Sequence, residues 1–107
     1  MRELSVRDLK AAQDDGTAAH WDLLDVREPW EHALCALPGA RLMPMQGLPG
    51  RLQELDPTRP TVVLCHHGMR SYQVAVWLER NGFTDVANLS GGIDAWAREI
   101  DPGMAQY

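Results

Sequence analysis

The sequence has 107 residues, 45% of them hydrophobic, which is enough to bury one core and too little for two. We therefore expect residues 1–107 to form a single domain. The formal net charge of −5 disfavours nucleic acids and membrane surfaces as partners, because both require a basic face. No segment is long and apolar enough to span a bilayer, and the N-terminal residues lack the apolar run of a signal peptide, so we expect a cytoplasmic protein.

The N-terminal part of the chain predicts a helix, a strand and a short helical turn. Ser5 is placed to cap a helix with apolar residues at helical spacing, and this helix fades near residues 14–16. Residues 21–26 are short, apolar and flanked by polar turns, which favours a buried strand over a helix. A short helical turn from Trp30 to Leu34 follows.

The middle of the chain contains the clearest strand. Residues 40–43 follow a Pro-Gly turn and predict a brief strand, and residues 48–55 predict a helix. Residues 61–64, Thr-Val-Val-Leu, are β-branched and continuously apolar, as expected for the middle of a parallel sheet covered on both faces. Cys65 follows this strand directly.

The C-terminal part repeats the alternation of helix and strand. Residues 71–81 place apolar side chains on one helical face, and Gly82 is positioned as the left-handed residue that ends the helix. Residues 85–89 predict a last strand, and a helix begins after Gly91-Gly92. Strands that alternate with helices predict an α/β domain with a parallel sheet.

The segment 62–71, V-V-L-C-H-H-G-M-R-S, places a thiol between the end of a strand and the start of a helix. Ligands of open α/β sheets bind at this edge. Successive N–H groups in such a loop form an anion-binding nest, to which the helix adds its positive end. Gly68 supplies the positive φ that inward-facing amides require. We predict Cys65 as the catalytic nucleophile and the following residues as the substrate-binding site: His66, His67, Gly68, Met69, Arg70 and Ser71.

Activation of Cys65 needs more than a helix end. A free thiol with a pKa of about 8.5 needs a depression of roughly two units, or about 2.7 kcal/mol, to become a useful nucleophile at neutral pH. A helix end supplies only about 0.3–1 kcal/mol. The remainder must come from N–H donors and from a cation, for which Arg70 is the nearest candidate.

These residues also have structural interpretations. Cys65 would then be an inert buried thiol at a strand end, and His66 and His67 would be solvent-facing loop residues. Two cysteines, Cys35 and Cys65, are too few for a disulfide scaffold. We expect no metal, because neighbouring histidine side chains diverge and the sequence shows no further cluster of ligands.

Residues 23–96 resemble the rhodanese homology domain. The similar pieces are L-L-D-V-R-E (23–28), E-H (31–32), L-P-G-A (37–40), the Cys65 segment and L-S-G-G-I-D-A-W (89–96), and their order and spacing together are specific. The resemblance implies a central, mostly parallel sheet of about five strands with helices on both faces. It also implies that Cys65 takes sulfane sulfur from a donor such as thiosulfate and passes it from a persulfide to cyanide or a thiol.

The resemblance assigns further roles. Residues 66–69 would supply the backbone cradle, and Arg70 would close the loop and face the anion. In this family a six-residue loop, here 65–70, goes with sulfur transfer, and a loop longer by one residue goes with dual-specificity phosphatases. Asp25 and Arg27 match a family motif and either brace the loop electrostatically or form a plain structural ion pair. We expect no cofactor, a monomer, and small-molecule donors and acceptors, with a protein sulfur acceptor as a further option.

The role of Cys35 and the function of the protein both have alternative interpretations. The family often has G-H-I-P-G-A where residues 35–40 read C-A-L-P-G-A, so Cys35 either resolves an oxidised Cys65 or fills a small apolar site. A phosphatase or arsenate reductase also uses a cysteine and an arginine around an oxyanion, although the short loop disfavours it. A non-catalytic rhodanese module that binds a partner or carries sulfur is the other alternative, and the retained cysteine argues against it.

Overall fold

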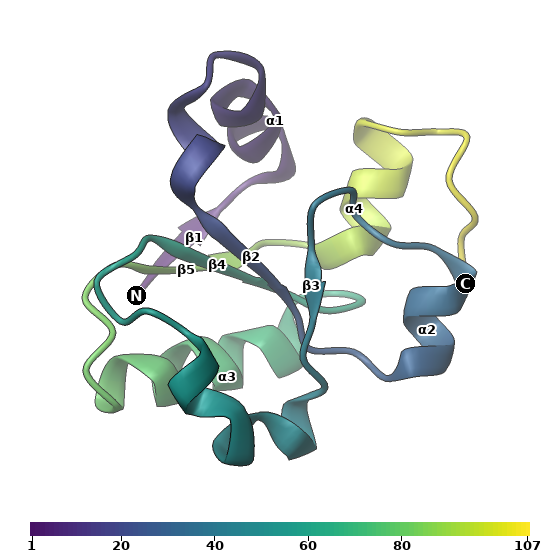
Figure 1. Cartoon of the computed structure of the whole chain (residues 1–107). Helices are drawn as coiled ribbons and strands as arrows, with labels where there is room; N and C mark the ends of the chain where they lie inside the picture. The colour runs from purple at the N-terminus through teal and green to yellow at the C-terminus, as the bar shows by residue number, and fades with distance from the viewer.

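The structure is a computed structural model that describes all of residues 1–107. Its centre is a sheet of five parallel strands in the order β1-β5-β4-β2-β3. The strands are β1 (Arg2–Leu4), β2 (Asp22–Asp25), β3 (Arg41–Leu42), β4 (Thr61–Leu64) and β5 (Val86–Leu89). Helices lie on both sides of this sheet (Figure 1). The α/β architecture predicted from the sequence is confirmed.

Two layers of helices cover the sheet. Figure 1 shows α1 and α4 on one face and α3 with the 3₁₀ helix η2 on the other, while α2 lies beside the C-terminus. None of the helices combines the length and the apolar character that crossing a lipid bilayer requires. The helices are α1 (Val6–Asp14), η1 (Thr17–His20), α2 (Pro29–Leu34), η2 (Met45–Glu54), α3 (Met69–Arg80) and α4 (Gly92–Glu99).

Alternation along β4 divides the core into two halves. Val62 and Leu64 belong to the cluster that also contains residues of α1 and α4. Val63 and Cys65 belong to the opposite cluster, which contains residues of α3. Successive residues of a strand point to opposite faces, so the period of two places Cys65 on the α3 side of the sheet.

Local signals in the sequence account for the helix ends. Ser5 caps α1 by accepting a hydrogen bond from the amide of Asp8 at 3.0 Å. Gly82, with φ of +91°, follows α3 in the left-handed region, as predicted.

Three elements differ from the prediction, and the first is the short 3₁₀ helix η1, which the sequence analysis did not predict. Residues 48–55 were expected to form a helix, and residues 48–54 lie in the 3₁₀ helix η2, which contains Pro49 and ends before Leu55. Proline has no N–H to donate, so it interrupts the hydrogen bonds that an α-helix needs. Strand β1 was not predicted, because its three residues are mostly polar and exposed. It forms through pairing with β5, which is a tertiary contact and not a local preference.

Candidate active site

The loop between β4 and α3 folds its backbone amides around one sulfur atom. The N–H groups of Gly68 and Ser71 donate hydrogen bonds to Sγ of Cys65 over 3.1 and 3.4 Å. Gly68 is the N-cap of α3, and its φ of +106° lies in a region that residues with side chains rarely adopt. Helix α3 begins at Met69, two residues before the predicted start, so its positive end lies at this loop.

Cys65 is only 1% exposed, and uncharged donors surround its sulfur. Burial raises the pKa of the Cys65 thiol, but hydrogen bonds from the hydroxyl and amide of Ser71 and from the amides of Gly68 and His67 outweigh this effect. The pKa of Cys65 therefore lies below its ordinary value. The amides converge on the sulfur as expected of an anion nest, while the catalytic role of Cys65 stays a prediction.

The N-terminus of α4 anchors the same loop. The carbonyl oxygens of Cys65 and His66 accept hydrogen bonds from the amides of Ile93 and Asp94 over 2.9 and 3.0 Å. This approach requires glycine at position 92, because a Cβ there would lie 2.4 Å from the Cys65 oxygen and 2.5 Å from the His66 oxygen. Gly92 therefore allows helix α4 to fix the backbone of the loop.

The guanidinium of Arg70 is held by a carboxylate. It donates hydrogen bonds to both carboxylate oxygens of Glu31 over 2.7 and 2.9 Å. Chiefly because of these bonds, the pKa of Glu31 is lowered to about 2. The resemblance predicts that Arg70 faces the bound anion. In the structure, the guanidinium of Arg70 is bonded to the carboxylate of Glu31. A role of Arg70 toward an anion stays a prediction.

The two histidines of the loop stack on each other, whereas we expected their side chains to diverge. Their ring centroids are 3.9 Å apart, and His66 also stacks on Tyr107 at 3.8 Å with an interplanar angle of 6°. Burial, followed by repulsion from His67, lowers the pKa of His66, which favours the neutral form of its ring. Met69 points away from the core and is 78% exposed.

A carboxylate also lies near these histidines. Ligand atoms of His66, His67 and Asp94 all lie within 4.8 Å of one another. The two imidazole planes differ by only 29°, so their in-plane lone pairs do not converge well on one point, and Asp94 already pairs with Arg98 at 3.0 Å. The sequence did not indicate the proximity of Asp94, and the expectation of no metal stays a prediction.

Asp25 and Arg27 form a fully buried ion pair at the end of β2. Two nitrogens of Arg27 donate to the two carboxylate oxygens of Asp25 over 2.9 and 2.7 Å. The guanidinium also donates to the carbonyl of Cys35 at 2.7 Å and to the hydroxyl of Tyr107 at 3.0 Å. A further bond to the carbonyl of Glu31, at 3.3 Å, reaches α2, so Arg27 ties together α2, the segment after it and the C-terminal residues. None of these bonds reaches the Cys65 loop directly, and a role of the pair in bracing that loop stays a prediction.

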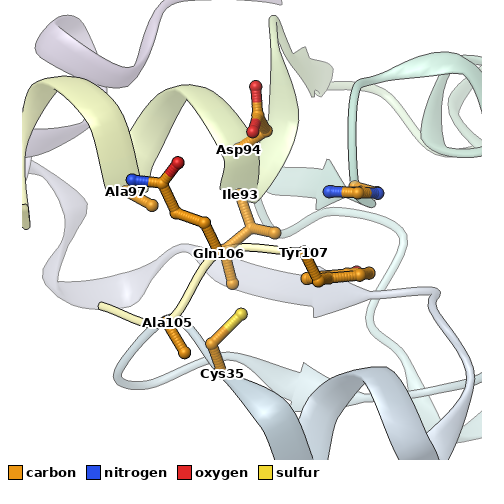
Figure 2. A pocket seen from close by; sticks show the side chains of 8 residues that line it. Cys35, Ile93, Asp94, Ala97, Ala105, Gln106 and Tyr107 are labelled. Atoms are coloured by element: carbon orange, nitrogen blue, oxygen red, sulfur yellow. The ribbon is translucent and has the colours of Figure 1, made fainter.

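Tyr107 was not singled out from the sequence. Its hydroxyl donates to Glu31 at 2.7 Å and accepts from Arg27. Figure 2 shows Tyr107 next to Gln106 and Ala105, in a pocket that Cys35 also lines and that is too narrow for a water molecule. Nothing in the pattern of a terminal aromatic residue indicates which distant side chains it contacts.

Glu31 and Asn88 are two further polar residues of the site that the sequence analysis did not single out. Glu31 holds Arg70, and Asn88 accepts a hydrogen bond from Ser71 at 2.6 Å. Asn88 did carry a signal, because it is the one polar residue in the apolar strand Val-Ala-Asn-Leu. A buried amide in such a strand needs hydrogen-bond partners.

Comparison with known proteins gives the family of the chain. Residues 5–99 match the family profile of the Rhodanese-like domain. The chain belongs to the rhodanese-like family. A crystal structure of a rhodanese-like domain protein from Staphylococcus aureus superposes with a TM-score of 0.84 at 30% identity, covering 100% of this chain and 99% of that one. The resemblance noted in the sequence, and the rhodanese-like fold that it implies, are confirmed.

Several rhodanese relatives have names that describe sulfur transfer. A protein of Allochromatium vinosum named sulfurtransferase is 43% identical over 83 residues, which cover 78% of each chain. The thiosulfate sulfurtransferase GlpE of Pseudomonas fluorescens is 33% identical over 84 residues, covering 78% of this chain and 77% of the relative. A rhodanese-like/PpiC domain-containing protein 12 of Arabidopsis thaliana is 37% identical over 112 residues, and this chain spans only 38% of its length.

Proposed function

We propose that this rhodanese is a sulfurtransferase that carries sulfane sulfur as a persulfide on Cys65. The observation that carries the proposal is the pair of backbone amides, from Gly68 and Ser71, that donate to Sγ of Cys65. Amide donors of this kind stabilise a negative sulfur in the thiolate and in the persulfide alike. The names of the Allochromatium and Pseudomonas relatives support the same reaction.

In the first half of the cycle, the thiolate of Cys65 attacks the outer sulfur of thiosulfate. A bond forms between Sγ and that sulfur, the sulfur–sulfur bond of the donor breaks, and sulfite leaves with the bonding electron pair. The product is a persulfide anion on Cys65. The lowered pKa of Cys65 favours this step because it raises the fraction of thiolate.

In the second half of the cycle, an acceptor takes the outer sulfur. Cyanide or a thiolate attacks it, the bond to Sγ breaks, and the Cys65 thiolate returns as the leaving group. A low thiol pKa helps here as well, since a more stable thiolate leaves faster. No general base is needed in either half, because thiolate and persulfide are both anions.

The burial of Cys65 limits the size of the donor group that can reach its sulfur. Cys65 is 1% exposed and lines none of the cavities of the structure. A donor that presents a single terminal sulfur suits such a site better than one that must insert a bulky group. Phosphoryl transfer would place three additional oxygen atoms inside the loop.

Intact mass spectrometry after incubation with thiosulfate tests this function. We expect one added sulfur atom on the unaltered protein and on Cys35→Ser, and none on Cys65→Ser. Subsequent addition of cyanide should remove the sulfur and release thiocyanate. Cys35→Ser is the matched control, because it removes the other thiol of the chain and leaves the Cys65 loop intact.

Three results would contradict the proposal. Sulfur loading that survives in Cys65→Ser would place the persulfide elsewhere. Absence of loading in the unaltered protein, with any persulfide donor as well as thiosulfate, would favour a non-catalytic module. Turnover of an aryl phosphate that disappears in Cys65→Ser would instead indicate a phosphatase.

A further inference from the structure

A buried asparagine reaches the Cys65 loop from the sheet. Asn88 is 3% exposed and lies in β5, beside Val63 of β4 in the strand register. Paired residues of parallel strands share a face, so Asn88 lies on the same side of the sheet as Val63 and Cys65. Its side chain thereby contacts the middle of the Cys65 loop, at Gly68, and the residue that follows the loop, Ser71.

The contacts of Asn88 fix the orientation of its amide. Nδ2 donates to the carbonyl oxygen of Gly68 at 3.1 Å and to the two carboxylate oxygens of Glu3 at 3.1 and 3.2 Å. All three atoms accept hydrogen bonds and donate none. A flipped amide would turn Oδ1 toward these three acceptors and would lose every one of these bonds. Oδ1 therefore faces Oγ of Ser71, at 2.6 Å.

The hydroxyl of Ser71 has one proton, and two atoms compete for it. Oδ1 of Asn88 can only accept, so the Ser71 proton points toward it. Toward Sγ of Cys65, 3.3 Å away, Ser71 then offers a lone pair. A lone pair accepts the proton of a neutral thiol but repels a thiolate. When the thiol proton leaves to water, the Ser71 proton must turn from Asn88 to the sulfur to stabilise the anion.

We propose that Asn88 is a positioning residue for the sulfur transfer proposed above, on which this inference rests. It holds the Ser71 proton while the sulfur of Cys65 is neutral and yields it when the sulfur is an anion. The exchange is favourable because a hydrogen bond to an anion is stronger than one to a neutral amide. Asn88 also holds the carbonyl of Gly68, whose own amide binds the sulfur.

These two effects of Asn88 act on the pKa of Cys65 with opposite signs. Competition for the Ser71 proton raises the pKa, because the thiolate gains Ser71 only after the bond to Asn88 breaks. Anchoring of Gly68 lowers the pKa, because it keeps an amide aimed at the sulfur. A purely structural role for Asn88 would include the second effect alone.

A double-mutant cycle separates the two effects. The rate of alkylation by iodoacetamide as a function of pH gives the pKa of Cys65 and needs no sulfur donor. In the Ser71→Ala background, Asn88→Leu reports only the anchoring of Gly68, and with Ser71 present it reports both effects. We compare the change in the pKa of Cys65 that Asn88→Leu causes in the two backgrounds. With Ser71 present, this change should be more negative than in Ser71→Ala by about half a pKa unit to one unit, which is the equivalent of one neutral hydrogen bond.

Equal shifts in the two backgrounds, or a difference of the opposite sign, would overturn the proposal. Asn88→Ala replaces Asn88→Leu in the cycle if the leucine variant does not fold. The unaltered chain supplies an independent readout by NMR, since the side-chain amide signals of Asn88 should change as Cys65 titrates and should stay constant in Ser71→Ala. Signals that stay constant in the unaltered chain would contradict the proton exchange.

The readouts distinguish this inference from the proposed function. Alkylation and NMR report the thiol and its neighbours without any sulfur donor. If the unaltered protein fails to acquire sulfur from any donor but shows the coupling between Asn88 and Ser71, the proposed sulfur transfer fails and the proton exchange stands. If it loads sulfur but shows no coupling, only the role of Asn88 fails.

Discussion

Gly92→Ala tests whether close packing of α4 on the loop controls the reactivity of Cys65. The added Cβ would lie 2.4 and 2.5 Å from two carbonyl oxygens of the loop, distances that real Cβ atoms essentially never show. The loop must therefore move, and the hydrogen bonds from Ile93 and Asp94 must lengthen. Overpacking of this kind costs about 1–3 kcal/mol, and a non-glycine residue at the φ of +59° adds about 1–2 kcal/mol.

Gly82→Ala is the matched control for this substitution. Gly82 has φ of +91°, and a Cβ there would meet no atom within 4 Å. Its substitution therefore carries the conformational term alone, about 1–2 kcal/mol. We expect Gly92→Ala to lower the free energy of unfolding by about 1–3 kcal/mol more than Gly82→Ala does, as measured by urea denaturation.

The two glycine variants should also differ in chemistry. Displacement of the loop in Gly92→Ala moves the amides of Gly68 and Ser71 away from the sulfur, so the pKa of Cys65 should rise and sulfur loading should slow. Gly82→Ala should leave both unchanged, because it lies at the far end of α3 from the loop. Equal losses of stability, together with an unchanged alkylation profile in Gly92→Ala, would refute the reasoning.

Three substitutions test the polar network around the site. Arg27→Met leaves the buried carboxylate of Asp25 without its guanidinium and with the partly exposed ring of His32, at 3.2 Å, as its remaining side-chain partner, so it should lower the free energy of unfolding by about 3–5 kcal/mol in urea denaturation, and an unchanged midpoint would contradict this. The pKa of Glu31 is lowered from 4.5 to about 2, so its stabilising contribution is present above pH 4.5 and is lost as the pH falls toward 2. The melting temperature of the unaltered protein should therefore fall as the pH is lowered through this range, and it should fall less in Glu31→Gln. Tyr107→Phe removes the hydroxyl that binds Arg27 and Glu31, so it should lower the free energy of unfolding by about 1 kcal/mol in urea denaturation. Because the phenylalanine ring still stacks on His66, NMR titration should show little change in the pKa of His66.

The sequence was sufficient to predict the strand, loop and helix that carry Cys65, because each depends on neighbours in the chain. The β-branched run before Cys65 indicates β4, and the apolar face from Val74 to Leu78 indicates α3. Gly68 adopts the positive φ that inward-facing amides require. These signals are local, so a single sequence contains all of them.

The partners of the charged residues could not be predicted, because they depend on tertiary contacts. Arg70 pairs with Glu31, 39 positions earlier in the chain, and Asn88 contacts Glu3, 85 positions away. The unpredicted β1 brings Glu3 beside Asn88 through strand register. Composition and periodicity contain no information on such pairs, so the sequence named Arg70 and missed what holds it.

The arrangement of charges explains how a protein with a net charge of −5 can stabilise an anionic sulfur. The cations near the loop are already paired, Arg27 with Asp25 and Arg70 with Glu31. The donors that reach Cys65 are backbone amides and a hydroxyl, whose aim depends on the loop and not on the net charge. Salt screens exposed charges but does not screen a fixed, buried amide. The pKa of Cys65 should therefore respond to substitutions that move the loop, such as Gly92→Ala, far more than to ionic strength.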